Sequence, residues 1–173
     1  SGSKNEAGSV GPVFGLVRWA HAVPALLLAM AWTHVYASDA ALARALAHSA
    51  QGAWNSAIGF YRSAARLNPG NVMARYFGGA ALLDRGREED LPKAQRLFDS
   101  VRREVPDYVL LNYKYWLLYN RLGLTRKAQE ALARQIRLDP LAAVFYLDRG
   151  RLALDEQRWE EAYQDFETAT RVE

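Results

Sequence analysis

Apolar and charged positions divide the chain into two unequal parts. Between Val10 and Ser38 the only formally charged residue is Arg18, and residues 19–37 contain no Asp, Glu, Lys or Arg. Beyond Ser38, apolar residues recur with the three- and four-residue spacing of amphipathic helices, and charged residues occupy the positions between them. The pattern predicts an all-α chain in which one apolar helix precedes a set of amphipathic helices.

The apolar segment has the length and ends of a membrane span. A helix from Trp19 to Tyr36 would be about 26 Å long at about 1.5 Å per residue, close to the roughly 30 Å of a bilayer's hydrocarbon core. Aromatic side chains mark both ends of the segment, as they do at headgroup level. We predict a transmembrane helix over residues 19–37, preceded by a flexible or interfacial segment over 1–18. The residues expected to form the anchor are Trp19, Leu26, Leu27, Leu28, Trp32 and Tyr36.

Three other interpretations of this segment stay open. It fits a signal peptide cleaved after Ala37, a soluble helix covering the end of the next domain, or a re-entrant or interfacial helix. Pro24 favours the last of these, because proline inside a helix costs about 3 kcal/mol. We therefore expect the regular helix to begin near Val23.

The second part of the chain repeats itself. Pro69, Pro106 and Pro140 end successive units at intervals of 37 and 34 residues. In each unit a small residue is followed four positions later by a bulky apolar one, which places both on one face of a helix. These pairs are Ala57 and Tyr61, Ala94 and Phe98, Ala128 and Leu132, and Ala162 and Phe166.

A 34-residue period with this pattern resembles the tetratricopeptide repeat family, over about four-fifths of the chain. The resemblance implies a right-handed α-solenoid of about four helix pairs, preceded by the apolar helix. The predicted solenoid domain covers residues 38–173, with repeats 38–71, 72–108, 109–142 and 143–173. Two features depart from the family. Trp116 replaces a small residue in the third unit, and the second unit has three extra residues, where we expect Asp90 to cap the helix that Pro92 starts.

Composition argues against several classes of function. The 22 basic and 19 acidic side chains nearly balance, which does not favour a nucleic-acid binder. The chain has no Cys, so it has no disulfide, Cys-ligated metal or Cys nucleophile. His21 and His34 lie about 220° apart around a helix, so they cannot share one ion, although either could contact a haem or chlorin pigment. We expect no catalytic residue, metal or cofactor, and a non-enzymatic protein.

The family resemblance also implies a concave groove, lined by the first helix of each pair, that binds a protein segment. The expected groove residues are Tyr76, Leu83, Leu110, Tyr113, Leu117, Asn120, Arg121, Leu147 and Arg151. Because most of these are apolar, we expect an apolar or aromatic segment, with an acidic group facing Arg121 and Arg151. An alternative occupant is the chain's own N-terminal arm.

These observations favour a membrane-anchored scaffold that holds the subunits of a larger membrane complex and contacts lipid through its N-terminal helix. Lys4 and Arg18 precede the apolar segment, which favours a cytoplasmic N-terminus and a periplasmic solenoid at a bacterial inner membrane. Two alternatives remain. One is the C-terminal tail of an O-antigen ligase- or polymerase-type membrane enzyme, which residues 105–109 resemble. The other is a periplasmic adaptor released by signal cleavage.

Overall fold

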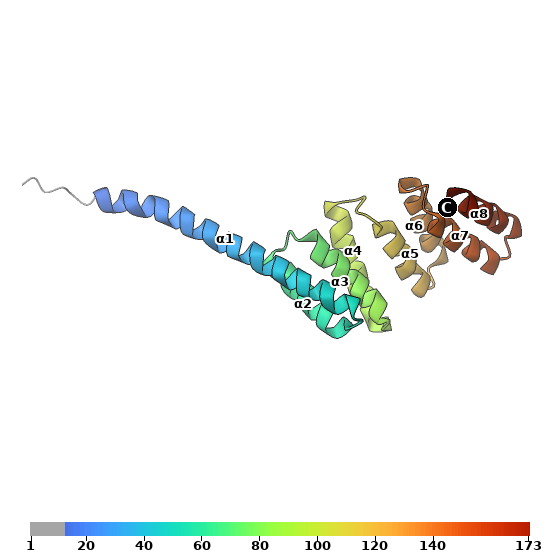
Figure 1. The fold of residues 1–173 in the computed structure, drawn as a ribbon, viewed down its shortest axis with the longest axis horizontal. Coiled ribbons are helices and arrows are strands. Elements are labelled where there is room, and N and C mark those ends of the chain that lie inside the picture. Colours follow the sequence, from blue (N-terminus) through green and yellow to red (C-terminus); the bar gives the residue numbers. More distant parts are fainter. Residues whose placement is uncertain (1–12) are drawn as a thin grey trace, which may run out of the picture.

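The computed structural model describes the backbone of residues 13–173 and the side chains from Ala22 onward. All regular elements of this part are helical, and Figure 1 shows them in order along the molecule. They are α1 (Val13–Ala50), α2 (Trp54–Leu67), α3 (Val72–Arg85), the 3-10 turn η1 (Glu88–Asp90), α4 (Leu91–Glu104), α5 (Leu111–Arg121), α6 (Thr125–Leu138), α7 (Ala143–Asp155) and α8 (Trp159–Val172).

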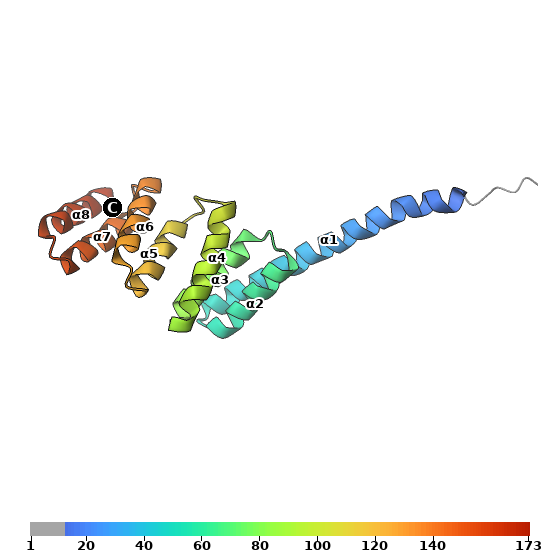
Figure 2. The same ribbon diagram turned by 180° about the vertical axis from the view of Figure 1, so that it is seen from behind.

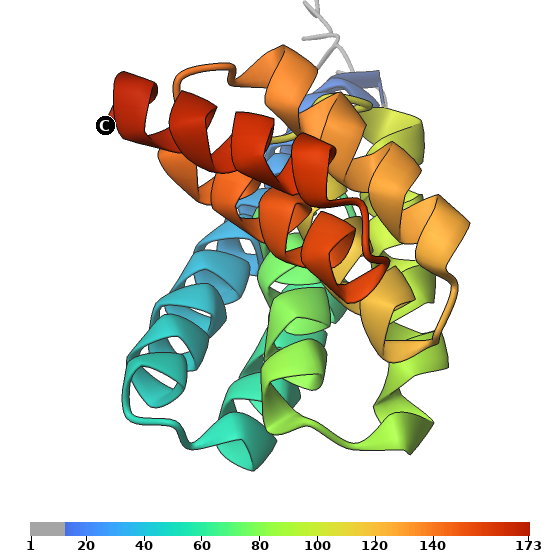
Figure 3. The ribbon, with the colours of Figure 1, turned by 90° about the vertical axis from the view of Figure 1, so that its right-hand side faces the viewer.

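The helices pack as antiparallel pairs that follow one another along the long axis. The C-terminal part of α1 pairs with α2, α3 with α4, α5 with α6 and α7 with α8. Figures 1 and 2 show these pairs from two sides, and Figure 3 shows them from one end. The predicted all-α solenoid of four helix pairs is therefore confirmed. We call α1, α3, α5 and α7 the first helices and α2, α4, α6 and α8 the second helices.

Helix α1 is one continuous helix, and only its C-terminal part packs against the solenoid (Figure 1). It begins at Val13 and continues through Pro24, so the expected start near Val23 is wrong. Proline removes a single backbone hydrogen bond, and the Ala- and Leu-rich sequence beyond it has a high helix propensity, which keeps the helix regular. Of the predicted segment 1–18, residues 13–18 belong to α1 and the rest lie outside the described part.

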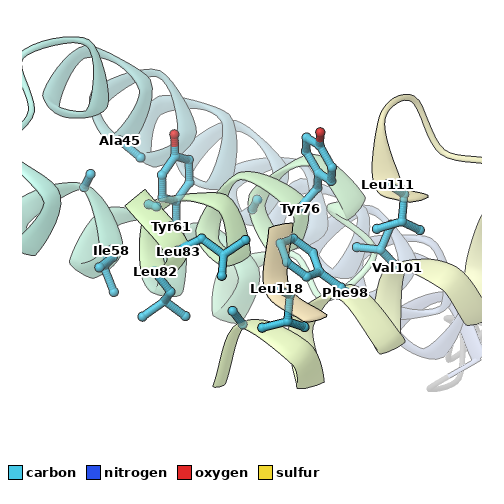
Figure 4. Packing of buried hydrophobic residues seen from close by; sticks show 14 of the residues in the cluster. Ala45, Ile58, Tyr61, Tyr76, Leu82, Leu83, Phe98, Val101, Leu111 and Leu118 are labelled. Carbon is cyan, nitrogen blue, oxygen red and sulfur yellow. The ribbon is translucent and has the colours of Figure 1, made fainter. Parts of the chain in front are cut away.

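The small-and-large pattern of the second helices forms the core. Ala57, Ala94 and Ala128 are fully buried. Tyr61 and Phe98 belong to the larger of two clusters of buried apolar residues (Figure 4). Gly79 of α3 lies directly against Phe98, because a Cβ atom built on this glycine would be 2.6 Å from Phe98 Cε1. Gly150 of α7 meets Phe166 of α8 at the same distance. Glycine therefore allows the two helices of a pair to approach in the second and fourth units.

Trp116 joins two parts of this core. One cluster of buried residues extends from α1 to α6, and a second consists of Leu132, Ile136 and Phe145. The Trp116 ring packs against both clusters. The bulky residue that departs from the family pattern thus fills the space between the third unit and its neighbours.

The turn with extra residues is held by a buried ion pair. Asp90 precedes α4, but its side chain makes no capping hydrogen bond to the backbone, so the expected cap is wrong. The carboxylate is fully buried and lies 2.6 Å from Arg85 Nη2 and 3.1 Å from Lys93 Nζ. Burial would raise the pKa of Asp90, but the hydrogen bonds and charges of these two cations outweigh burial and hold the pKa below its usual value. Pro92 lies in the first turn of α4, as expected.

Candidate functional site

The exposed part of α1, residues 22–36, carries apolar side chains in several directions around its axis, and Thr33 and His34 are its polar residues. Leu26, Leu27 and Leu28 are 61–63% exposed and point in directions about 100° apart. Trp32 and Tyr36 are 72% and 78% exposed, whereas the Trp19 side chain is outside the described residues. The part of α1 from Ala22 to Ala50 is long and apolar enough to cross a membrane. Signal sequences and buried core helices share this property. Between Ala22 and Tyr36 the apolar side chains are not buried in the core.

The predicted groove residues of the second unit lie in the core. Tyr76 and Leu83 of α3 are 5% and 2% exposed. The Tyr76 ring is surrounded by aromatic rings, with centroid distances of 5.1 Å to Phe77, 6.3 Å to Phe98 and 4.8 Å to Tyr108. Tyr108 belongs to the segment between α4 and α5, which covers this stretch of α3. Tyr76 and Leu83 therefore stabilise the solenoid and have almost no surface for a partner.

Tyr113 connects the third and fourth units. Its hydroxyl group donates a hydrogen bond of 2.9 Å to Asp148 Oδ2 on α7, and its ring lies 5.2 Å from that of Phe145. Asp148 also accepts a hydrogen bond of 3.2 Å from Arg151 Nη1. This end of the predicted groove thus contains its own acid and its own cation.

Arg121 also has an internal partner. Its Nη1 atom donates a 2.6 Å hydrogen bond to the carbonyl oxygen of Leu83, near the C-terminal end of α3, and the same oxygen accepts a hydrogen bond from the Gly86 N–H group. An acidic ligand would have to compete with these contacts at both Arg121 and Arg151. Among the other predicted residues, Leu110 precedes α5 in a left-handed conformation, Asn120 is exposed, and Leu117 and Leu147 are partly buried.

The tyrosines predict a stability loss at alkaline pH. Burial raises the pKa of Tyr76 and of Tyr113 to about 12, and the hydrogen bond to Asp148 adds to the effect at Tyr113. Tyrosine ionises near pH 10 when unfolded, so stability is complete below pH 10 and falls as the pH rises towards 12. The loss should reach up to about 2 kcal/mol per tyrosine. Urea denaturation between pH 8 and 12, followed by circular dichroism, measures it.

A matched variant separates this effect from general alkaline unfolding. Tyr113→Phe cannot ionise at this position, so its stability should fall less steeply above pH 10 than that of the unmodified chain. Equal slopes for the two proteins would contradict the assignment to Tyr113.

A hollow that the sequence did not predict lies between α2, α3 and α4. It has a volume of about 400 Å³, and two second helices form its walls while α3 forms its floor. Its apolar lining includes Ile58, Ala65, Leu82 and Leu97. Gly78 contributes space at the floor, since a Cβ atom there would come within 3.3 Å of Tyr61 Cβ.

All charged side chains that line this hollow are basic, and we call it the arginine-rimmed cleft. Its charged lining residues are Arg62, Arg66, Arg75, Lys93 and Arg96. Arg75 pairs with Glu104, and Lys93 with Asp90. Arg62, Arg66 and Arg96 make no ion pair within the described part of the chain. Sequence reasoning missed this cleft because it followed the first helices; the four-residue spacing of Arg62 and Arg66 was the available signal.

Histidines form no recognisable site in the described residues. His48 stacks on Phe60 at 5.3 Å, as a semi-buried structural residue. His34 lies beside the C-terminal end of α2, near Arg66, and the His21 side chain lies outside the described part. No group of three His, Asp or Glu side chains in the described range is arranged to hold a metal ion.

Comparison with known proteins identifies the fold. No protein-family model and no curated protein matches the chain. Among solved structures, MamA 41-end from Desulfovibrio magneticus RS-1 is 20% identical over 78% of this chain and 75% of its own, with a TM-score of 0.70. Another MamA crystal structure is 21% identical over 78% and 77%, with the same TM-score. A tetratricopeptide repeat protein from Parabacteroides merdae ATCC 43184 is 21% identical over 79% and 54%, with a TM-score of 0.69. The fold of this chain is that of a tetratricopeptide-type α-solenoid.

Proposed function

We propose that this chain is a non-enzymatic scaffold, anchored in a bacterial inner membrane by α1, whose solenoid binds protein partners in a larger membrane complex. The observation that carries the proposal is the exposed, predominantly apolar and uncharged surface of α1 between Ala22 and Tyr36, continuous with a repeat solenoid. Such a surface favours an apolar environment, and lipid or neighbouring membrane helices supply one.

The solenoid supports the interaction role. Stacked helix pairs form extended surfaces whose curvature follows from the repeat, and such surfaces bind protein segments or helices. The residues of the first helices that keep some exposed surface, including Leu117, Asn120 and Leu147, belong to this proposal as one candidate surface. Lys4 and Arg18 lie before the apolar segment and favour a solenoid on the periplasmic side.

Deletion of residues 1–37 tests the anchor. Among the α1 side chains that the structure describes, Ser38 is the first buried one, and Ala41, Leu42 and Ala45 follow it, so the deletion keeps these side chains, which belong to the part of α1 that pairs with α2. The full chain should remain in the membrane pellet after an alkaline carbonate wash, whereas the shortened chain should be found in the soluble fraction. Immunoblotting of both fractions is the measurement.

Two substitutions on α1 provide the control. Leu27→Lys combined with Leu28→Lys charges the exposed apolar segment and should move a large share of the full chain out of the pellet. Leu46→Lys charges a partly exposed leucine of the same helix beside α2 and should leave the fractionation unchanged. A full-length chain that is soluble without any change would overturn the proposed anchor.

A further inference from the structure

We propose that the arginine-rimmed cleft binds an acidic protein segment that carries a bulky apolar side chain. The apolar side chain would enter the hollow between α2, α3 and α4, while carboxylates of the same segment pair with Arg62, Arg66 and Arg96. This inference rests on the proposed role in protein binding but not on the membrane anchor. It concerns the face formed by the second helices, whereas the groove predicted from the sequence is lined by the first helices.

The chemistry of the lining selects the occupant. At about 400 Å³ the cleft falls in the size range of pockets for small ligands, roughly 300–1,000 Å³. Its floor, formed by Ala74, Gly78 and Leu82, offers contacts to an apolar group, and its lining contains no Asp or Glu. The guanidinium groups come from both walls, with Arg62 and Arg66 on α2 and Arg96 on α4. A carboxylate on either side of the apolar group would therefore find a fork of N–H donors.

The neighbouring hollow on the same face continues this pattern. It has a volume of about 390 Å³ between α4, α5 and α6, and its charged lining residues are four cations, Arg102, Lys127, Arg134 and Arg137, and one acid, Glu130. Glu130 pairs with Arg126 and Arg134 with Asp107, so the hollow keeps an excess of positive charge. Asn112 lines it too, is fully buried, and its Nδ2 atom has no hydrogen-bond partner. A buried amide donor without a partner costs roughly 1–3 kcal/mol, and an acceptor from a ligand would offset that cost. Both hollows of the second-helix face are thus suited to a ligand rich in acceptors.

The arrangement of the two hollows along the solenoid favours a protein segment over a lipid headgroup. The two hollows lie between successive second helices, from α2 to α6, and Figure 1 shows this series leading away from the exposed part of α1. A bilayer around residues 22–36 of α1 would lie close to the first hollow, because His34 lies beside Arg66, whereas an extended acidic segment can follow both hollows.

Fluorescence anisotropy with synthetic peptides tests the proposal on the full chain in neutral detergent. The probe is a labelled 14-residue peptide with a central Phe-Leu pair between blocks of Glu. We expect saturable binding that weakens as salt is raised. Replacing each Glu by Gln, or Phe-Leu by Ala-Ala, should weaken binding at least tenfold. Absence of binding by the Glu peptide, or equal binding of all three, would overturn the proposal.

Variants locate the site. Arg62→Glu with Arg96→Glu should weaken binding at least tenfold, and Ala65→Phe, which fills the cleft without changing charge, should do so too. The matched control is Arg44→Glu with Arg171→Glu, the same charge change at exposed positions away from the cleft. Equal loss in the control would show non-specific attraction and refute the site. Thermal melts confirm that each variant is folded.

Short-chain phosphatidylglycerol provides the competing arm. If it binds in a manner that depends on Arg62 and Arg96 while the Glu peptide does not bind, the occupant is a lipid and the proposal is wrong. Because membrane fractionation does not enter these measurements, a failed anchor and a failed cleft give different results.

Discussion

Replacing Asp90 by alanine should lower the free energy of unfolding by about 3 kcal/mol. The carboxylate is fully buried and is the shared partner of Arg85 and Lys93. Its removal leaves Arg85, whose side chain is 17% exposed, with a hydrogen bond to Asn55 Oδ1 but without a counter-charge. Breaking a buried pair from one side costs about 3–5 kcal/mol, and the half-exposed Lys93 favours the lower value. Urea denaturation at pH 7, followed by circular dichroism, gives the difference.

The adjacent residue Glu89 is the matched control. It belongs to the same 3-10 turn, but its side chain is 67% exposed and its nearest cation, Arg87, is 3.6 Å away. Glu89→Ala should therefore change stability by less than about 1 kcal/mol. If both alanine variants were equally stable, the buried ion pair would not be what holds the turn.

The same substitution has a signature in its pH dependence. Because the pKa of Asp90 is lowered in the folded state, its contribution is present above the ordinary value of 3.8 and is lost as the pH falls through the lowered pKa. The stability gap between the unmodified chain and Asp90→Ala should accordingly narrow below about pH 4.

Gly79→Ala should destabilise the second helix pair by about 2 kcal/mol, even though alanine favours helix formation. The new methyl group would lie 2.6 Å from Phe98 Cε1 and 3.0 Å from two further ring atoms. Phe98 is fully buried in the core, so its ring has no free space into which to move. The measurement is the urea midpoint of the variant and of Gly79→Ala combined with Phe98→Leu, in which part of the loss should be recovered.

Gly59→Ala should have the opposite sign. Gly59 lies in the middle of α2, and a Cβ atom there would meet no atom within 4 Å. The substitution removes only the conformational freedom of glycine in the unfolded chain and should stabilise the protein by up to about 1 kcal/mol. If Gly59→Ala and Gly79→Ala changed the free energy of unfolding by the same amount and sign, close contact between helices would not determine the effect of the substitution.

The local pattern of the second helices was predictable because it depends on neighbours in one helix and its partner. The spacing of Ala94 and Phe98 places both residues on one buried face, and Pro106 follows soon after the end of α4, as the sequence predicts. Pro24 was misleading, because its local cost in helix stability is offset by the many helix-favouring residues of the long helix that continues on both sides.

The first helices were harder to interpret because their exposure depends on residues far along the chain. Tyr76 is covered by Tyr108, which lies 32 positions later in an irregular segment. Arg121 donates to the carbonyl group of Leu83, 38 positions earlier. Helical spacing identifies the face on which a residue lies, but not whether a loop or a distant arginine occupies that face. For the same reason, the cleft at Gly78 emerges only when α2, α3 and α4 are assembled.

The absence of a turn between the exposed and the packed parts of α1 fixes the rotational orientation of the solenoid about that helix. Each residue inserted or removed between Tyr36 and Ser38 would rotate the solenoid by about 100° and shift it by about 1.5 Å along the axis. A flexible linker would let the repeat domain search for partners in all directions. A continuous helix instead holds the arginine-rimmed cleft in one fixed orientation relative to the surroundings of the exposed part of α1. The choice of partner therefore depends on the length of α1 as well as on the side chains of the cleft.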